Sequence, residues 1–107
     1  MGFSNRMEAG KTVVEIEDAR LDANLATPFR DYMFGLINAG QIDLVLDLSK
    51  VDFMDSSGLG AIVAVLKQLN GNGELQLAAP GKAVSDLFDL TCMDQIFKIH
   101  PSLDQAL

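Results

Sequence analysis

Two adjacent serines, Ser56 and Ser57, are the residues of this chain best placed to carry out or receive chemistry. They lie between Asp55 and Gly58, where a short apolar stretch typical of a strand gives way to a helical pattern. A hydroxyl at a helix start can act as a nucleophile, cap the helix or accept a phosphate. The rest of the sequence discriminates among these roles.

A nucleophilic serine requires a base, and the sequence offers few candidates. His100 is the only histidine and lies far along the chain, beside Pro101. No glycine precedes the serines to form the G-x-S-x-G turn of many hydrolases. Cys92 lies in apolar sequence, where we expect a small buried thiol. We therefore do not expect an enzyme.

Metal and nucleotide sites are also poorly supported. The carboxylates of Asp43, Asp47, Asp52 and Asp55 could suggest magnesium, but no second group of carboxylates stands at a recognisable spacing. Gly58-Leu59-Gly60 is a weak match to a dinucleotide-binding turn, because it lacks the third glycine. These glycines are better explained by close packing of the helix start, and we expect neither a cofactor nor a metal.

Capping and phosphorylation of the serines both remain open. Asp and Ser are favoured at helix N-caps, where replacement by Ala typically costs about 1 kcal/mol. A phosphate adds about −1.5 to −2 of charge, which a helix N-terminus tolerates. One division of roles has Ser57 as the main cap and Ser56, one residue outside the helix, as the phosphate acceptor.

The elements around the serines follow from hydrophobic periodicity. A helix after Asp22 carries an apolar stripe from Phe29 to Ile37, and Gly40 is expected to close it. Asp22, Asn24 and Thr27 are its candidate caps, with Pro28 in the first turn. The predicted strands are 3–8, 11–17, 42–48 and 74–78, the other helices are 57–69 and one around 84–88, and an apolar segment at 96–99 precedes a last helical turn ending at 107.

The order β-β-α-β-α-β-α predicts a single α/β domain over residues 1–107. We expect a mixed sheet of four to five strands, packed by amphipathic helices. In strand 11–17, Val14 and Ile16 should share one face and Val13 should share the other, wetter face with the glutamates. The serines would lie in a loop leaving the carboxyl end of a strand, a usual functional position in such sheets.

Composition narrows the class of partner. The 107 residues carry a net charge of −7, which disfavours nucleic acid. No apolar run reaches the ~20 residues of a membrane span, and the N-terminus shows no hydrophobic signal core, so we expect a cytoplasmic protein with no direct membrane insertion. A single cysteine fits a reducing compartment.

The stretch from Phe53 to Gly60, following the strand-like residues 44–48, closely resembles the core motif of bacterial anti-sigma factor antagonists of the STAS-domain family. The run Asp-Ser-Ser-Gly-Leu-Gly carries most of this likeness. Arg20-Leu21-Asp22-Ala23 is similar to the family's Gly-x-Leu-Asp-Ala segment. Residues 73–77, with the Pro-Gly break and short helix after them, resemble its second half.

The resemblance implies a binding module that works by partner switching. The unphosphorylated protein would bind an anti-sigma factor that is also a serine kinase, and so release a sigma factor. The kinase would phosphorylate Ser56 and thereby expel the antagonist, and a metal-dependent, PP2C-like serine phosphatase would restore it. The alternative is a STAS domain that serves as a non-switching scaffold subunit of a signalling or lipid-transport complex.

The expected partner surface surrounds Ser56. By resemblance and position, Asp22 and Asp55 would shape the acceptor site. The small apolar residues on the far side of the helical stripe would either contact the partner or lie under neighbouring helices. The full set is Asp22, Asp55, Ser56, Ser57, Gly58, Leu59, Ala61, Ala64 and Val65.

Overall fold

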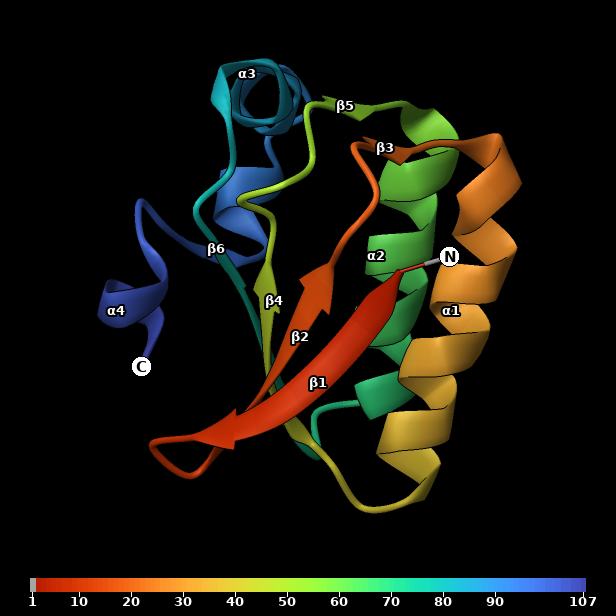
Figure 1. Ribbon diagram of the computed structural model, residues 1–107, viewed down its shortest axis with the longest axis vertical. Helices are drawn as coiled ribbons and strands as arrows, with labels where there is room; N and C mark the ends of the chain where they lie inside the picture. The colour runs from red at the N-terminus through yellow and green to blue at the C-terminus, as the bar shows by residue number, and fades with distance from the viewer. Residues whose placement is uncertain (1) are drawn as a thin grey trace.

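A five-stranded mixed sheet forms the middle of the molecule (Figure 1), as the sequence predicts. The computed structural model describes residues 2–107. The strand order is β1-β2-β4-β6-β7, with the β1–β2 pair antiparallel and the other pairs parallel. The elements are β1 (Phe3–Glu8), β2 (Lys11–Ile16), β3 (Arg20–Leu21), α1 (Ala23–Asn38), β4 (Asp43–Asp47), β5 (Phe53–Met54), α2 (Ser56–Leu69), β6 (Glu74–Ala78), α3 (Lys82–Leu90), the 3-10 turn η1 (Met93–Gln95), β7 (Lys98–His100) and α4 (Leu103–Ala106).

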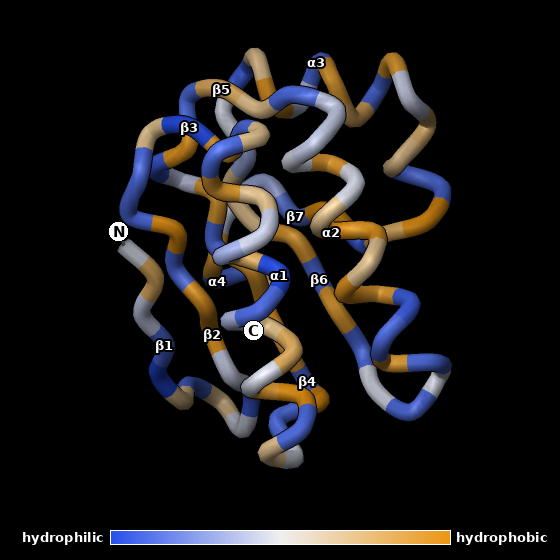
Figure 2. The backbone as a smooth tube through the Cα atoms, turned by 90° about the vertical axis from the view of Figure 1, so that its right-hand side faces the viewer, coloured by the Kyte–Doolittle hydropathy of each residue, from blue (hydrophilic) through white to orange (hydrophobic). Residues whose placement is uncertain are grey.

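Both faces of the sheet are covered. Helices α1 and α2 lie on one face and the short α4 lies on the other (Figure 1), while the most apolar backbone follows β2, β4 and β6 between them (Figure 2). Val13 is therefore fully buried, packed with Val45, Ala78 and Ala106. The expected wetter face of β2 is wrong at Val13, because α4 covers that position.

The structure contains two strand pairings that the predicted element order lacks. The apolar segment near residue 97 leads into β7, which pairs with β6 and completes the fifth strand. A separate two-stranded parallel pair joins β3 to β5, where Arg20 lies opposite Phe53 and Leu21 opposite Met54. These strands of two residues are too short to show any period in the sequence.

Helix α1 begins at its earliest candidate cap. The Asp22 carboxylate accepts a hydrogen bond from the backbone N–H of Asn24 at 3.0 Å. Pro28 is consequently the sixth helical residue, so its predicted place in the first turn is wrong. Gly40, with φ of +93°, follows the helix end as expected.

Cys92 does not have the buried position expected of it. Its side chain is exposed, and its backbone has a φ of +59° between α3 and η1. Its apolar neighbour Leu90 is exposed as well, so the end of α3 and the turn that follows it lie at the surface. Within residues 2–107, no helix combines the length and the apolar character that crossing a membrane requires.

Candidate functional site

The start of α2 differs from prediction in which residue caps it. Asp55 is the N-cap, and its Oδ1 accepts a hydrogen bond from the backbone N–H of Gly58 at 3.0 Å. Ser56 and Ser57 are the first two helical residues and both are exposed. The assignment of Ser57 as the cap, with Ser56 outside the helix, is therefore wrong. Neither serine hydroxyl has a hydrogen-bond partner within residues 2–107.

The helix start is fixed against the β3–β5 pair. A Cβ atom on Gly58 would lie 2.2 Å from the carbonyl oxygen of Leu21, so only glycine fits there. The backbone N–H of Asp55 also donates to that oxygen, at 3.4 Å. Close packing is thus confirmed for Gly58, whereas Gly60 is exposed with nothing within 4 Å of such a Cβ.

Asp22 and Asp55 occupy equivalent places in neighbouring helices. Each is the N-cap of its helix, and each follows one strand of the β3–β5 pair directly. Because that pair is parallel, the starts of α1 and α2 lie at the same end of it (Figure 1). The structure therefore brings these two half-buried carboxylates to the edge of the site that contains Ser56.

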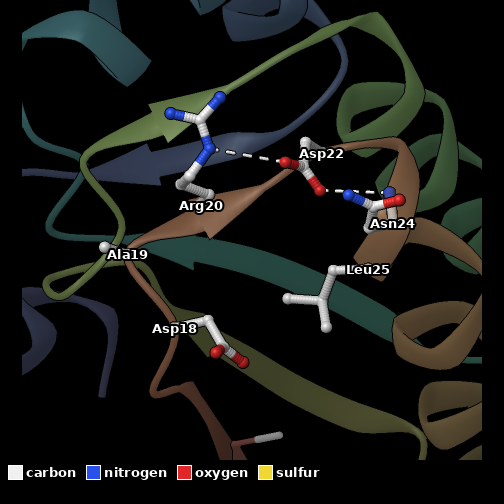
Figure 3. A pocket seen from close by; sticks show the side chains of 6 residues that line it. All are labelled: Asp18, Ala19, Arg20, Asp22, Asn24 and Leu25. Carbon is white, nitrogen blue, oxygen red and sulfur yellow. Dashed lines mark hydrogen bonds and ion pairs between the residues drawn. The ribbon is translucent and has the colours of Figure 1, made fainter.

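Arg20 is a residue of this site that the sequence did not identify as functional. Its Nε lies 3.4 Å from Oδ2 of Asp22, and its guanidinium carbon lies 4.3 Å from the ring centroid of Phe53. Figure 3 shows the side chain leaving β3 toward the ribbon of β5. The sequence signal that could have identified Arg20 is its place as a lone basic residue in an acidic segment, two residues before the cap Asp22.

An open pocket of about 350 Å³ lies beside this group (Figure 3). It is lined by the segment that follows β2 and by the first turn of α1. Its lining combines apolar surface with the charged side chains of Asp18, Arg20 and Asp22. The lining residues are Asp18, Ala19, Arg20, Asp22, Asn24 and Leu25.

Most of the apolar residues expected on the partner surface are buried in the structure. Ala61 and Val65 are 6% and 0% exposed, because α1 packs beside α2 and both residues join the core. Leu59 is buried with them, and Ala64 is half-buried. The outward side of α2 instead presents its two serines, Gly60, Lys67 and Gln68.

Other residues considered for chemistry are engaged elsewhere. A ring nitrogen of His100 lies 2.6 Å from Oε1 of Gln76. Asp43 pairs with Lys11 at 3.6 Å, and Oδ1 of Asp47 accepts a hydrogen bond from the backbone N–H of Ser49. The structure thus does not bring His100, Asp43 or Asp47 to the serines.

Comparison with known proteins agrees with this architecture. A family model described as STAS domain matches residues 8–106. The chain belongs to the STAS domain family. In this STAS domain, the motif from Asp55 to Gly60 forms the start of α2 and the β3–β5 pair supports it.

Several relatives of this STAS domain are named as anti-sigma factor antagonists. A Thermotoga maritima protein named as an anti-sigma factor antagonist is 31% identical over 97 residues, covering 89% of this chain and 86% of its own length. A Staphylococcus aureus anti-sigma-B factor antagonist is 31% identical over 90 residues, covering 83% and 71%. The crystal structure of an anti-sigma factor antagonist from Mycobacterium paratuberculosis superposes with a TM-score of 0.89 at 27% identity, covering 98% and 89%.

Proposed function

We propose that this STAS domain is an anti-sigma factor antagonist whose binding is switched off by a phosphate on Ser56. The observation that carries the proposal is the exposed Ser56 hydroxyl at the first position of α2, next to a cap supplied by Asp55. The names of the relatives support the antagonist role. The domain contributes a binding surface and a phosphate acceptor, and its partners contribute the chemistry.

The local geometry suits a reversible change of charge. Asp55 already binds the Gly58 amide, so modifying Ser56 removes no capping bond. The first amides of a helix lack carbonyl partners in the helix, and the dipole there favours an anion. The phosphate therefore changes the surface while the fold is retained.

The proposed partners supply the chemistry that acts on the site. In this proposal a separate kinase activates the Ser56 hydroxyl and transfers the phosphoryl group from ATP. In this proposal that kinase is also the anti-sigma factor. A separate metal-dependent serine phosphatase removes the phosphate and returns the antagonist to its binding form.

The acceptor is tested by incubating the protein with its cognate kinase and ATP, followed by mass spectrometry of the peptides. We expect one phosphate on Ser56 and none in Ser56→Ala. Ser57→Ala is the matched control, because its hydroxyl is also exposed one residue later, and it should still be modified. Phosphate on Ser57, or on neither serine, contradicts the proposal.

Binding is tested with Ser56→Asp and Ser57→Asp, which add the same charge one residue apart. We expect Ser56→Asp to weaken binding to the kinase at least tenfold with an unchanged unfolding midpoint. Ser57→Asp should have the smaller effect. If the protein instead co-purifies with subunits of a membrane complex and Ser56→Asp leaves that association intact, the scaffold role is correct.

A further inference from the structure

We propose that Arg20 is the intramolecular counter-ion of phosphorylated Ser56. This inference rests on the proposed function and deepens it, because it assigns the group within this chain that receives the new phosphate. It concerns residues of the β3–β5 pair, the start of α2 and the carboxylates next to them.

The register of the β3–β5 pair places Arg20 on the same side as the acceptor loop. Leu21 and Met54 lie opposite each other and are 0% and 6% exposed, so they form the inward side of the pair. Side chains alternate along a strand, which places Arg20 and Phe53 on the outward side. Continuing the register by one step sets Asp22 opposite Asp55, and Ser56 follows at once.

The Arg20 side chain is already directed toward this end of the pair. Its Nε lies beside Asp22, which follows β3 at the same end of the pair where Asp55 follows β5. Phe53 and Ser56 are three residues apart, a span of at most about 10 Å. The guanidinium already lies over the Phe53 ring, and we expect a change of side-chain rotamer to bring it to a phosphate on Ser56.

Arg20 can leave Asp22 without disturbing α1. The two oxygens of Asp22 have separate roles, since Oδ1 accepts the capping bond from Asn24 and Oδ2 faces Arg20. The Arg20 contact is long, at 3.4 Å, and its side chain is 62% exposed. Breaking this contact leaves the cap in place, and a guanidinium has five N–H donors to offer a phosphate.

Electrostatics favour the movement of Arg20 from Asp22 to a phosphate on Ser56. The groups around the site are acidic, with Asp22 and Asp55 as caps and Asp18 and Asp52 in the adjoining loops. A phosphate adds nearly two further negative charges to this region. Arginine binds phosphate through two parallel hydrogen bonds, which is stronger than one long contact with a carboxylate. Phosphorylation therefore draws Arg20 from Asp22 to Ser56.

The test uses full-length protein with phosphoserine encoded genetically at position 56, so no kinase is needed. The phosphate is titrated with pH and followed by ³¹P NMR, since the second pKa of phosphoserine is normally about 6. A nearby guanidinium stabilises the dianion and lowers this pKa. We expect Arg20→Gln to raise it by about 0.5 pH unit or more, and Arg20→Lys to raise it less.

Arg30→Gln is the matched control, because Arg30 also lies over an aromatic ring, that of Phe34, but further along α1. It should leave the phosphate pKa unchanged. An unchanged pKa in Arg20→Gln, or an equal change in Arg30→Gln, overturns the inference. Either result leaves open whether the kinase modifies Ser56, and failure of the kinase assay would not alter this titration.

Discussion

Asp55 and Ser56 divide two roles that the sequence assigned to the pair of serines. The carboxylate of Asp55 reaches the Gly58 amide, so the cap comes from the residue before Ser56. Both hydroxyls are consequently exposed. Sequence alone could not make this assignment, because Asp and Ser are about equally good caps and the helix start is uncertain by a residue or two.

Replacing Asp55 tests this division. Asp55→Ala should lower the free energy of unfolding by about 1 kcal/mol, because the Gly58 amide loses its partner. Ser57→Ala should change it by only a few tenths, and Asp55→Asn should retain most of the stability because Asn also caps well. Urea unfolding measures all three. A larger loss in Ser57→Ala than in Asp55→Ala would return the cap to the serine.

Lys50 gives a residue-scale prediction about pH. Its ammonium bonds to the Glu15 carboxylate at 2.7 Å, and this raises the pKa of Lys50 above its ordinary 10.5. A raised pKa in the folded protein means that the stabilisation is complete below pH 10.5 and is lost as pH rises through the folded value. The melting temperature of the wild type should exceed that of Lys50→Met at pH 8, and the gap should close toward pH 12. A gap that grows with pH would contradict this sign.

At the scale of elements, two close glycine contacts fix the junctions before and after α2. Gly58 faces the Leu21 carbonyl at the helix start, and a Cβ on Gly73 would lie 2.3 Å from the Ile42 carbonyl, where β6 begins beside β4. The first contact places the start of α2 against β3. The second brings the segment that leads into β6 close to the segment that leads into β4.

Gly58 and Gly60 of α2 provide a matched pair of substitutions that tests the close contact at Gly58. Gly58→Ala should destabilise the fold by about 1–3 kcal/mol, because the methyl group meets backbone that cannot move aside. Gly60→Ala should stabilise it by up to about 1 kcal/mol, because alanine is the better helix former and the space is open. Thermal unfolding of the two variants should shift in opposite directions. Equal shifts would mean that β3 yields to a side chain at position 58.

Element order was largely predictable and the connecting pieces were not. The long helices and the buried strands carry clear periods, so their order and type follow from the sequence. The β3–β5 pair has two residues per strand and no period of its own, although it supports the whole site. Arg20 went unrecognised for that reason, since its role depends on pairing with a residue 33 positions later.

At the scale of the whole molecule, α4 turns a one-sided sheet into a covered one. Ala106 is 4% exposed and packs with Val13, Val45 and Ala78. Sequence patterning predicted the last helical turn but not the face that it would cover. The same limit explains Ala61 and Val65, whose burial depends on α1 packing beside α2.

The packing of α4 on the sheet is tested by placing a charge at its buried contact. Ala106→Asp should cost about 2 kcal/mol or more, because a carboxylate would be buried among apolar groups without a partner. Gln105→Asp adds the same charge at an exposed neighbour and should cost little. Chemical denaturation of both variants gives the comparison. Similar midpoints would show that α4 detaches readily from the sheet.

The close contact at the start of α2 also bears on the speed of the proposed switch. Because Gly58 leaves no space between the first turn of α2 and the Leu21 carbonyl, we expect the helix start to stay in place when its first residue gains a phosphate. The signal then travels as charge and one side-chain movement, and rotamer changes take picoseconds to nanoseconds, whereas domain motions take microseconds or longer. The time between the two states should therefore be set by the kinase and the phosphatase alone, so the domain would keep no memory of its previous state.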